Sequence, residues 1–170
     1  DVEIIPSDDG NILKIHTETT GKLLYVRASL NKRDYKHIVV TGKMNYRDFL
    51  DLSSMTSDCK SLDLYGVEVD RIPDGLFHNI RELEKVVLPA NLKIVGGYNF
   101  QDCLNLKTVI LPENLEFIGL CSFQNCFDLQ LTVPDNVSVA PYAFSGCSKV
   151  KFPKNEIIED SEDEISESSN

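Results

Sequence analysis

The chain has 170 residues, is 42% hydrophobic, and carries 27 acidic and 17 basic residues, which give a formal net charge of −10. This length fits one domain with room for an apolar core. Nucleic-acid binding rests on Lys and Arg neutralising phosphate, so the acidic balance argues against a nucleic-acid partner. No apolar run approaches the roughly 20 residues of a membrane-spanning helix.

The acidic charge gathers at the end of the sequence. Beyond residue 155 there are seven acids and no base, so the rest of the chain carries a formal charge of about −3. Such a composition predicts a solvated tail over residues 154–170. Ile157 and Ile158 are apolar exceptions in this tail and could shield an open end of the folded part.

Two apolar stretches begin the chain and flank the turn signal Asp8-Asp9-Gly10-Asn11, which predicts a short hairpin or an extended arm. Residues 20–30 follow and place Leu23, Val26 and Leu30 on one helical face, so a helix is expected there.

A strand is predicted at residues 37–42, where an apolar run ends in glycine. A second helix is predicted at residues 45–55, with Asn45 as its N-cap and Asp48 three residues later. Another strand is predicted at residues 61–66.

From residue 72 to residue 153 the sequence repeats itself. Each copy has a phenylalanine, then Ile or Cys three residues later, then Leu or Val, then a short apolar run that ends in proline. The phenylalanines are Phe77, Phe100, Phe123 and Phe144, which lie 23, 23 and 21 residues apart. Self-similarity at such a period is the signature of a solenoid, in which each copy buries its apolar face against the neighbouring copies.

The earlier strands keep nearly the same period, since Val40, Leu64, Leu88 and Leu111 are separated by 24, 24 and 23 residues. We therefore expect three parts: an N-terminal cap with two diverged helix-containing repeats at 1–71, regular repeats at 72–153, and the acidic tail at 154–170. Such a cap would cover the apolar end of the stack.

The pattern Ile-Gly-x-x-Ala-Phe-x-x-Cys-x-x-Leu-x-x-Val-x-Leu-Pro-x-Asn-Leu resembles the BspA-like leucine-rich repeat of bacterial surface proteins. The resemblance implies an α/β-type repeat solenoid: a right-handed coil with a parallel sheet on one face, short helices or turns on the other, and a helical N-terminal cap. Two positions depart from the pattern, because Asn99 replaces a small residue and the last copy is shortened between Leu129 and Pro134.

The N-terminal part resembles, more loosely, the segment that begins exported Bacteroides-type members of the same family. Gly21-Lys22-Leu23, Asp48-Phe49 and Leu62-Asp63-Leu64 carry this second similarity. Together the two resemblances imply a secreted or cell-surface protein whose signal peptide has been removed, with an adhesin-like role.

The five cysteines follow the repeat, since Cys103, Cys126 and Cys147 occupy one equivalent position. Residues stacked one coil apart do not converge on a single ion, so a metal site is not expected. The leading interpretation is small buried thiols that pack as apolar groups. A local disulfide between Cys121 and Cys126 is the alternative.

Alternate strand residues point into the core and out to solvent. If Ile38, Leu62, Val86, Val109 and Leu131 point inward, their neighbours form an outer face with Thr41 and Tyr65 along one side. This face is the candidate binding surface. The simpler explanation for its apolar residues is that β-branched side chains are common in strands whether or not a partner binds there. Its candidate residues are Val39, Asp63, Tyr65, Lys85, Val87, Thr108, Ile110, Gln130 and Thr132.

No catalytic motif, cofactor-binding loop or metal-ligand spacing is present in the sequence. The favoured function is a non-enzymatic recognition module that binds an extracellular protein or glycan through the sheet face. The alternative is a structural or accessory domain of a larger surface protein, without a ligand of its own. The expected state is a monomer or weak end-to-end association; an enzyme with an unrecognised site ranks last.

Overall fold

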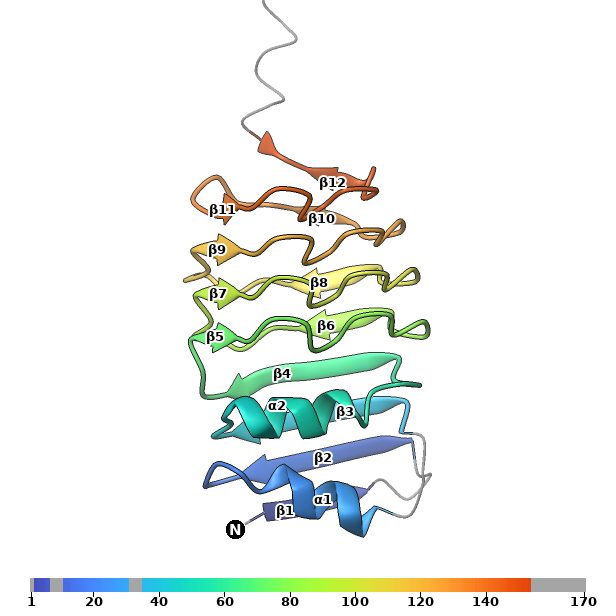
Figure 1. The fold of residues 1–170 in the computed structure, drawn as a ribbon, viewed down its shortest axis with the longest axis vertical. Helices are drawn as coiled ribbons and strands as arrows, with labels where there is room; N and C mark the ends of the chain where they lie inside the picture. Colours follow the sequence, from blue (N-terminus) through green and yellow to red (C-terminus); the bar gives the residue numbers. More distant parts are fainter. Residues whose placement is uncertain (1, 7–10, 31–34, 154–170) are drawn as a thin grey trace, which may run out of the picture.

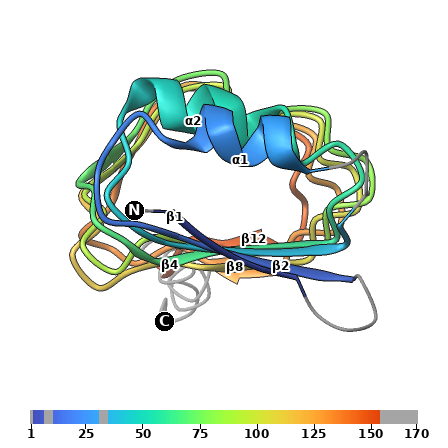
Figure 2. The same cartoon turned by 90° about the horizontal axis from the view of Figure 1, so that it is seen from below.

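The computed structural model describes residues 2–6, 11–30 and 35–153, and its backbone winds as a stack of coils (Figure 1). Viewed along the stack, one side of each coil is made of strands, and the helices α1 and α2 lie on the opposite side (Figure 2). The predicted repeat solenoid with a parallel sheet along one side is confirmed. The predicted tail at 154–170 lies outside the described residues, as do residues 7–10 of the N-terminal turn.

The main sheet has six strands in the order β1-β2-β3-β4-β6-β8. β1 and β2 pair antiparallel, as the hairpin among the two predicted alternatives requires, and all other neighbours are parallel. The strands predicted at 37–42 and 61–66 are confirmed as β3 and β4. The bounds are β1 Val2–Pro6, β2 Ile12–Thr17, β3 His37–Gly42, β4 Ser61–Val67, β6 Lys85–Val87 and β8 Thr108–Ile110.

The hydrogen-bonded ladder of this sheet stops after β8. β10 (Leu131–Thr132) and β12 (Val150–Lys151) form a separate parallel pair. The shortened last repeat explains the break, because Pro134 follows Leu129 by five residues whereas Pro112 follows Leu106 by six. The predicted inward residue Leu131 is accordingly only half-buried, although it still packs against the core.

A second, narrow sheet forms a corner of the coils and was not predicted from the sequence. Its four strands pair in parallel in the order β11-β9-β7-β5. Close stacking here requires glycine after two of the strands: a Cβ on Gly119 would lie 2.6 Å from the Gly97 nitrogen. The bounds are β5 Arg71–Ile72, β7 Ile94–Val95, β9 Phe117–Ile118 and β11 Ser138–Val139.

The repeated phenylalanines form a ladder through the core. Phe77, Phe100, Phe123 and Phe144 stack nearly parallel, with successive ring centroids 5.6, 5.3 and 5.3 Å apart. Phe49 from α2 meets the first ring edge-on at 6.5 Å, and Phe152 meets the last ring edge-on at 5.8 Å. The equivalent positions read from the sequence therefore meet one another coil by coil.

Two left-handed residues flank each phenylalanine of the ladder and turn the chain sharply on either side of the buried ring. Two residues before the ring, φ is +71° at Gly75, +58° at Tyr98, +54° at Cys121 and +59° at Tyr142. Two residues after it, φ is +56° at Asn79, +59° at Asp102, +61° at Asn125 and +83° at Gly146. The conformation recurs although glycine, which favours it, occupies only one of the four positions on each side.

Asn99, the unusual residue before Phe100, is completely buried, and both polar groups of its side chain form hydrogen bonds. Its side-chain amide donates to the carbonyls of Pro73 at 2.8 Å and Gly96 at 3.0 Å, and its oxygen accepts from the Leu76 nitrogen at 3.2 Å. In the next coil the equivalent residue is Ser122, whose hydroxyl lies within hydrogen-bond distance of the same Gly96 carbonyl at 2.8 Å and of the Gly119 carbonyl at 2.7 Å. Asparagine therefore satisfies buried backbone groups that a small apolar residue would leave to other partners.

The two helices are α1 (Leu23–Ser29) and α2 (Tyr46–Ser53). Asn45 is the N-cap of α2, as predicted, and it forms a reciprocal capping box with Asp48. From residue 72 to residue 153 the side opposite the main sheet is made of turns rather than helices. That the N-terminal coils act as a cap stays a prediction.

Candidate binding face of the main sheet

The strand register sets one column of side chains on the outer face of the main sheet. Lys14, Val39, Asp63, Val87 and Ile110 are successive partners across the parallel pairs. The residues on either side of this column in each strand point inward and are buried, Ile38, Leu62 and Val86 among them. The column therefore lies on the side predicted from the alternation of the sequence.

The predicted residues differ in how far they are exposed. Tyr65 is 63% exposed and Ile110 is 47% exposed, whereas Val39, Asp63, Val87 and Thr108 are half-buried by their neighbours. Lys85, Gln130 and Thr132 are exposed. The first seven of the nine candidates lie on the continuous sheet, and Gln130 and Thr132 lie beyond the break after β8. Gln130 stays close to that sheet, since its nitrogen donates to the Lys107 carbonyl at 3.0 Å.

A register shift places Tyr65 differently from the prediction. Thr41 was expected beside Tyr65, but Thr41 pairs with Gly66, because the register shifts between Val39 and Thr41. The Asp63 carboxylate accepts from the Tyr65 nitrogen at 2.9 Å. Gly66 is the one local signal for this irregularity: a Cβ there would lie 2.6 Å from the Thr41 methyl carbon.

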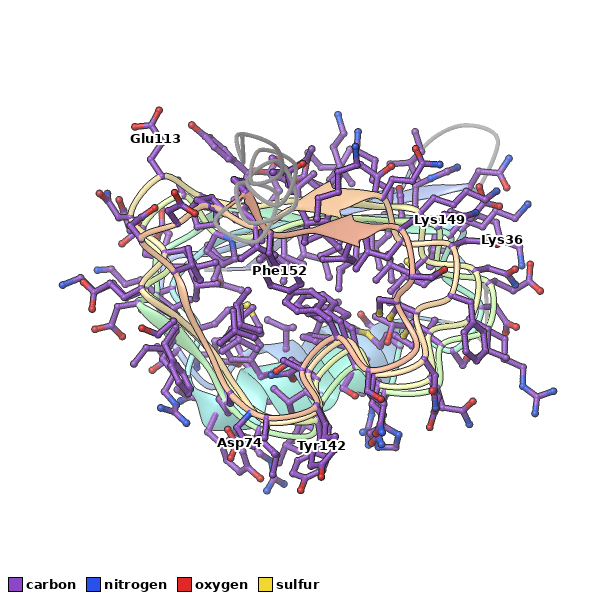
Figure 3. The ribbon with its side chains drawn as sticks, turned by 90° about the horizontal axis from the view of Figure 1, so that it is seen from above. Lys36, Asp74, Glu113, Tyr142, Lys149 and Phe152 are labelled. Carbon is purple, nitrogen blue, oxygen red and sulfur yellow. The ribbon has the colours of Figure 1, made fainter. Side chains whose placement is uncertain are left out.

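Tyr65 and Ile110 share a shallow pocket of about 320 Å³. Its apolar wall includes Leu88, Leu111 and Pro112, and Glu113 and Asn114 add polar groups. Figure 3 shows Glu113 on the sheet side of the molecule, away from Tyr142 and Asp74 on the opposite side. Sequence reasoning missed the residues from the turn after β8, because turn residues stand outside the strand alternation that located the others.

A second hollow of about 550 Å³ lies at the last coils and is lined by Gln130, Leu131, Thr132, Lys149 and Lys151. The Lys149 ammonium donates to the Asp128 carboxylate at 2.9 Å and lowers the pKa of that carboxyl. Lys151 is exposed on the last strand, so this hollow has two lysine side chains in its lining although the whole chain is acidic.

Two of the three histidines bond to hydroxyls on neighbouring strands: His16 Nδ1 lies 2.8 Å from Thr41 Oγ1, and His37 Nδ1 lies 2.7 Å from Ser61 Oγ. Within residues 2–6, 11–30 and 35–153, no group of three or more His, Cys, Asp or Glu side chains is placed to hold a metal ion. In the same ranges neither helix has the length and apolar character needed to cross a membrane.

All five cysteines are free and buried, so the alternative disulfide between Cys121 and Cys126 does not form here. The thiols of Cys103, Cys126 and Cys147 each point at the phenylalanine carbonyl of the preceding coil, at 3.3, 3.2 and 2.9 Å. Burial raises the pKa of Cys103 to about 12, and a hydrogen bond with Cys147 together with burial raises the pKa of Cys126.

We expect Cys59 and Cys103 to resist alkylation in the folded protein. Burial raises the pKa of each from 9.0 to about 12, so at pH 8 their thiolate fraction should fall about a thousandfold below that of an ordinary cysteine. Iodoacetamide labelling, followed by peptide mass analysis, should show slow modification of both residues in buffer. Modification should be fast in about 6 M guanidinium, which unfolds the protein. Equal rates in the two conditions would contradict their burial.

The regularity of the coils agrees with a comparison of the sequence with known families. The model of the BspA type leucine-rich repeat region, in six copies, matches residues 68–167. The chain belongs to this family. Leucine-rich repeat families are generally non-enzymatic protein-interaction scaffolds, and BspA-type members are typically surface or secreted bacterial proteins.

One solved structure places the fold among other leucine-rich repeat proteins. A leucine-rich repeat protein from Bacteroides ovatus superimposes with a TM-score of 0.52 and 20% identity, over 89% of this chain and 39% of that one. The leucine-rich repeat protein TpLRR of T. pallidum gives a TM-score of 0.42 and 15% identity, over 88% of this chain and 66% of that one. The chain thus spans well under half the length of the B. ovatus protein. No match was found among the curated proteins.

Proposed function

We propose that this BspA-type repeat domain is a recognition module of an exported or cell-surface protein, which binds a protein or glycan through the outer face of its main sheet. The observation that carries the proposal is the pocket where the exposed Tyr65 and Ile110 meet the turn at Glu113. Aromatic side chains are enriched at interfaces because they combine a large apolar area with a polar end.

The chemistry of the face supports a mixed polar and apolar partner. Tyr65, Val87 and Ile110 supply apolar contact area on three neighbouring strands. Glu113 offers a carboxylate in the pocket of Tyr65 and Ile110, and Lys149 and Lys151 offer ammonium groups in the hollow at the last coils. An extended face of this kind lets one partner contact several coils at once, which is how solenoids commonly bind.

The test is a binding screen of the purified domain against extracellular matrix proteins and a glycan array. A variant with Tyr65→Ser, Val87→Ser and Ile110→Ser should lose at least about 30-fold in affinity for any ligand found, as expected when residues at the centre of an interface are truncated. Its free energy of unfolding should fall by less than about 2 kcal/mol, since two of the three side chains are exposed.

The matched control carries Leu120→Ser and Tyr142→Ser, which remove exposed apolar side chains that lie outside the strands of the main sheet. The control should bind as the unchanged protein does. Binding that is lost in the control and kept in the triple variant would move the recognition surface off the sheet. Unfolding of the triple variant would show that its three side chains belong to the core.

A second candidate function is a structural part of a larger surface protein, with no ligand of its own. The strand edges at β11 and β12 favour it, because a strand at the edge of a sheet is a template for pairing with further chain. Solution mass separates the two candidates. Stable association through the ends would support the structural role, and a monomer that binds a ligand would support recognition.

A further inference from the structure

The narrow sheet has a free edge at its first strand, β5, on the side of the α2 coil (Figure 1). In the next two coils, a pair of adjacent backbone nitrogens donates to one carbonyl of the preceding coil at 2.8 and 3.0 Å: Lys93 and Ile94 to Asp70, and Glu116 and Phe117 to Lys93. The equivalent nitrogens of the β5 coil belong to Asp70 and Arg71. Neither donates to a backbone carbonyl within the part of the chain that the structure describes.

The α2 coil leaves this edge uncovered because its path is shorter. Gly42 pairs with Val67, so these residues mark one point in successive coils. Phe49 and Phe77 meet through their rings and mark a second point. The path between the two points takes seven residues in the α2 coil and ten in the β5 coil. The α2 coil therefore lacks the residues for a narrow strand of its own.

A hollow of about 560 Å³ lies between the two coils, beside this edge. Its lining includes Met44, Tyr46 and Phe49 from the α2 coil, and Asp70 and Arg71 from the segment that leads into β5. Tyr46 is 59% exposed and offers an aromatic surface opposite the two backbone nitrogens. The edge of the strand is thus open to an occupant that lies between β5 and α2.

The backbone groups at this edge define what can bind there. Two adjacent N–H groups that hold one carbonyl oxygen in every later coil remain available at Asp70 and Arg71. Pro73 occupies the place of Gly96, whose nitrogen donates to the Ile72 carbonyl at 2.9 Å, so the edge has no third donor at that place. The available groups match one carbonyl of an extended backbone.

The charges of the lining select among such occupants. The guanidinium of Arg71 forms an ion pair with the Asp74 carboxylate at 3.1 Å, so its charge is already balanced. The other charged residues of the lining are Glu68 and Asp70, and both are exposed. An anion at the two nitrogens would be repelled by these carboxylates, whereas a neutral carbonyl beside a cationic side chain would be attracted.

We propose that the free edge of β5 binds an extended peptide segment of a partner protein, and that this segment carries a Lys or Arg side chain. A peptide carbonyl accepts from the Asp70 and Arg71 nitrogens, the cationic side chain lies near Glu68 and Asp70, and a neighbouring side chain packs on Tyr46. Peptides that extend a sheet edge gain affinity from backbone hydrogen bonds and specificity from side-chain contacts. This site shares no residue with the pocket on the main sheet, so it stands whether or not that face binds a ligand.

Nuclear magnetic resonance of the intact, isotope-labelled chain tests the proposal. The probes are two mixtures of short blocked peptides, with Lys or Glu fixed at the centre and Val, Thr or Ser at the other positions. The Lys mixture should shift the amide signals of Asp70 and Arg71. The Glu mixture should shift them at least about fivefold less, because its charge is repelled. Absent shifts, or equal shifts with both mixtures, would overturn the proposal.

Two variants at Arg71 isolate the backbone donor. Arg71→Pro removes the N–H group, at a sheet edge where proline costs no ladder hydrogen bond. Arg71→Ala keeps the N–H group and removes the guanidinium. Binding of the Lys mixture should weaken at least about tenfold in the proline variant and should be kept or strengthened in the alanine variant. Equal weakening in the two variants would overturn the proposal.

A second pair of variants tests the charges and does not depend on the folding of the proline variant. Glu68→Gln with Asp70→Asn should weaken binding of the Lys mixture at least about fivefold. The control is Glu82→Gln with Glu84→Gln, which changes the net charge equally at residues outside the hollow. The control should bind as the unchanged protein does, and an equal loss in both pairs would contradict the proposed contact.

Two other occupants would be revealed by the same spectra. Acetate that shifts the Asp70 and Arg71 amides as strongly as the Lys mixture would make this edge an anion site. Shifts that appear when the protein alone is concentrated, and that vanish in Arg71→Pro, would mean that a second copy covers β5. Either result would overturn the proposal.

Discussion

Replacing Phe100 by alanine is expected to lower the free energy of unfolding by about 3–5 kcal/mol, the usual cost of deleting a buried aromatic ring. Phe100 is completely buried between Phe77 and Phe123, at centroid distances of 5.6 and 5.3 Å. The deletion would leave a cavity and interrupt the stack in its middle. Its neighbours cannot close the gap, because each is held between two left-handed turn residues.

Denaturant unfolding followed by circular dichroism measures this loss. The control is Phe127→Ala, which removes the same side chain from a position that is 51% exposed. We expect the control to cost less than about 1 kcal/mol. A loss below about 1 kcal/mol for Phe100→Ala as well would show that the ladder does not hold the coils together.

The second large effect is expected at Asp48, a completely buried carboxylate between the two N-terminal coils. It accepts from the nitrogens of Gly21 at 2.6 Å, Leu23 at 3.1 Å and Asn45 at 3.0 Å. It therefore serves the starts of both helices. Asp48→Ala would leave three backbone donors without this partner, and we expect it to cost about 3 kcal/mol or more.

Thermal and denaturant unfolding of Asp48→Ala, compared with the exposed Asp70→Ala, measures the effect. Amide exchange should also rise at Gly21 and Leu23, which are remote in sequence but bonded to Asp48. A loss in the free energy of unfolding equal to that of Asp70→Ala would mean that these amides form hydrogen bonds with water instead. The two N-terminal coils would then be joined by the β2–β3 ladder and apolar packing, without a net contribution from this carboxylate.

The parts of the fold that could be predicted are those fixed by the repeat period. Equivalent residues of a solenoid meet the same surroundings, so Phe77, Phe100 and Phe123 could be assigned to one core column without a structure. The helix N-cap at Asn45 was also predictable, because helix capping depends on residues that are close in the sequence. These features are local or repeat exactly one coil later.

The narrow sheet and the left-handed turn residues were not predictable in the same way. Strands of two residues are too short to show alternation. Three of the four left-handed positions before the rings hold Tyr98, Cys121 and Tyr142, so composition gives little sign of these, whereas the positions after the rings hold Asn, Asp or Gly, which tolerate this backbone. Packing between coils imposes that backbone in spite of the side chains.

The candidate face was predictable from strand alternation, but its pocket was not. Val87 and Ile110 follow from the period-two pattern. The position of Tyr65 depends on a register shift against Thr41, and Glu113 reaches the pocket from a turn in the following coil. Both depend on contacts between separate coils, which one sequence does not specify.

The uniform rise of the stack also determines how the molecule can change over generations. The backbone bonds of each coil reach the coil 23 or so residues away, as from Gly96 to Ile72 and from Gly119 to Val95. Removing residues 96–118 would therefore join Val95 to Gly119 with equivalent neighbours on both sides. Gain or loss of whole coils alters the length of the molecule without altering its cross-section, whereas a single inserted residue disturbs every partner it faces. Duplication of complete coils is thus the change that lengthens such a surface with the least disturbance of the contacts between coils.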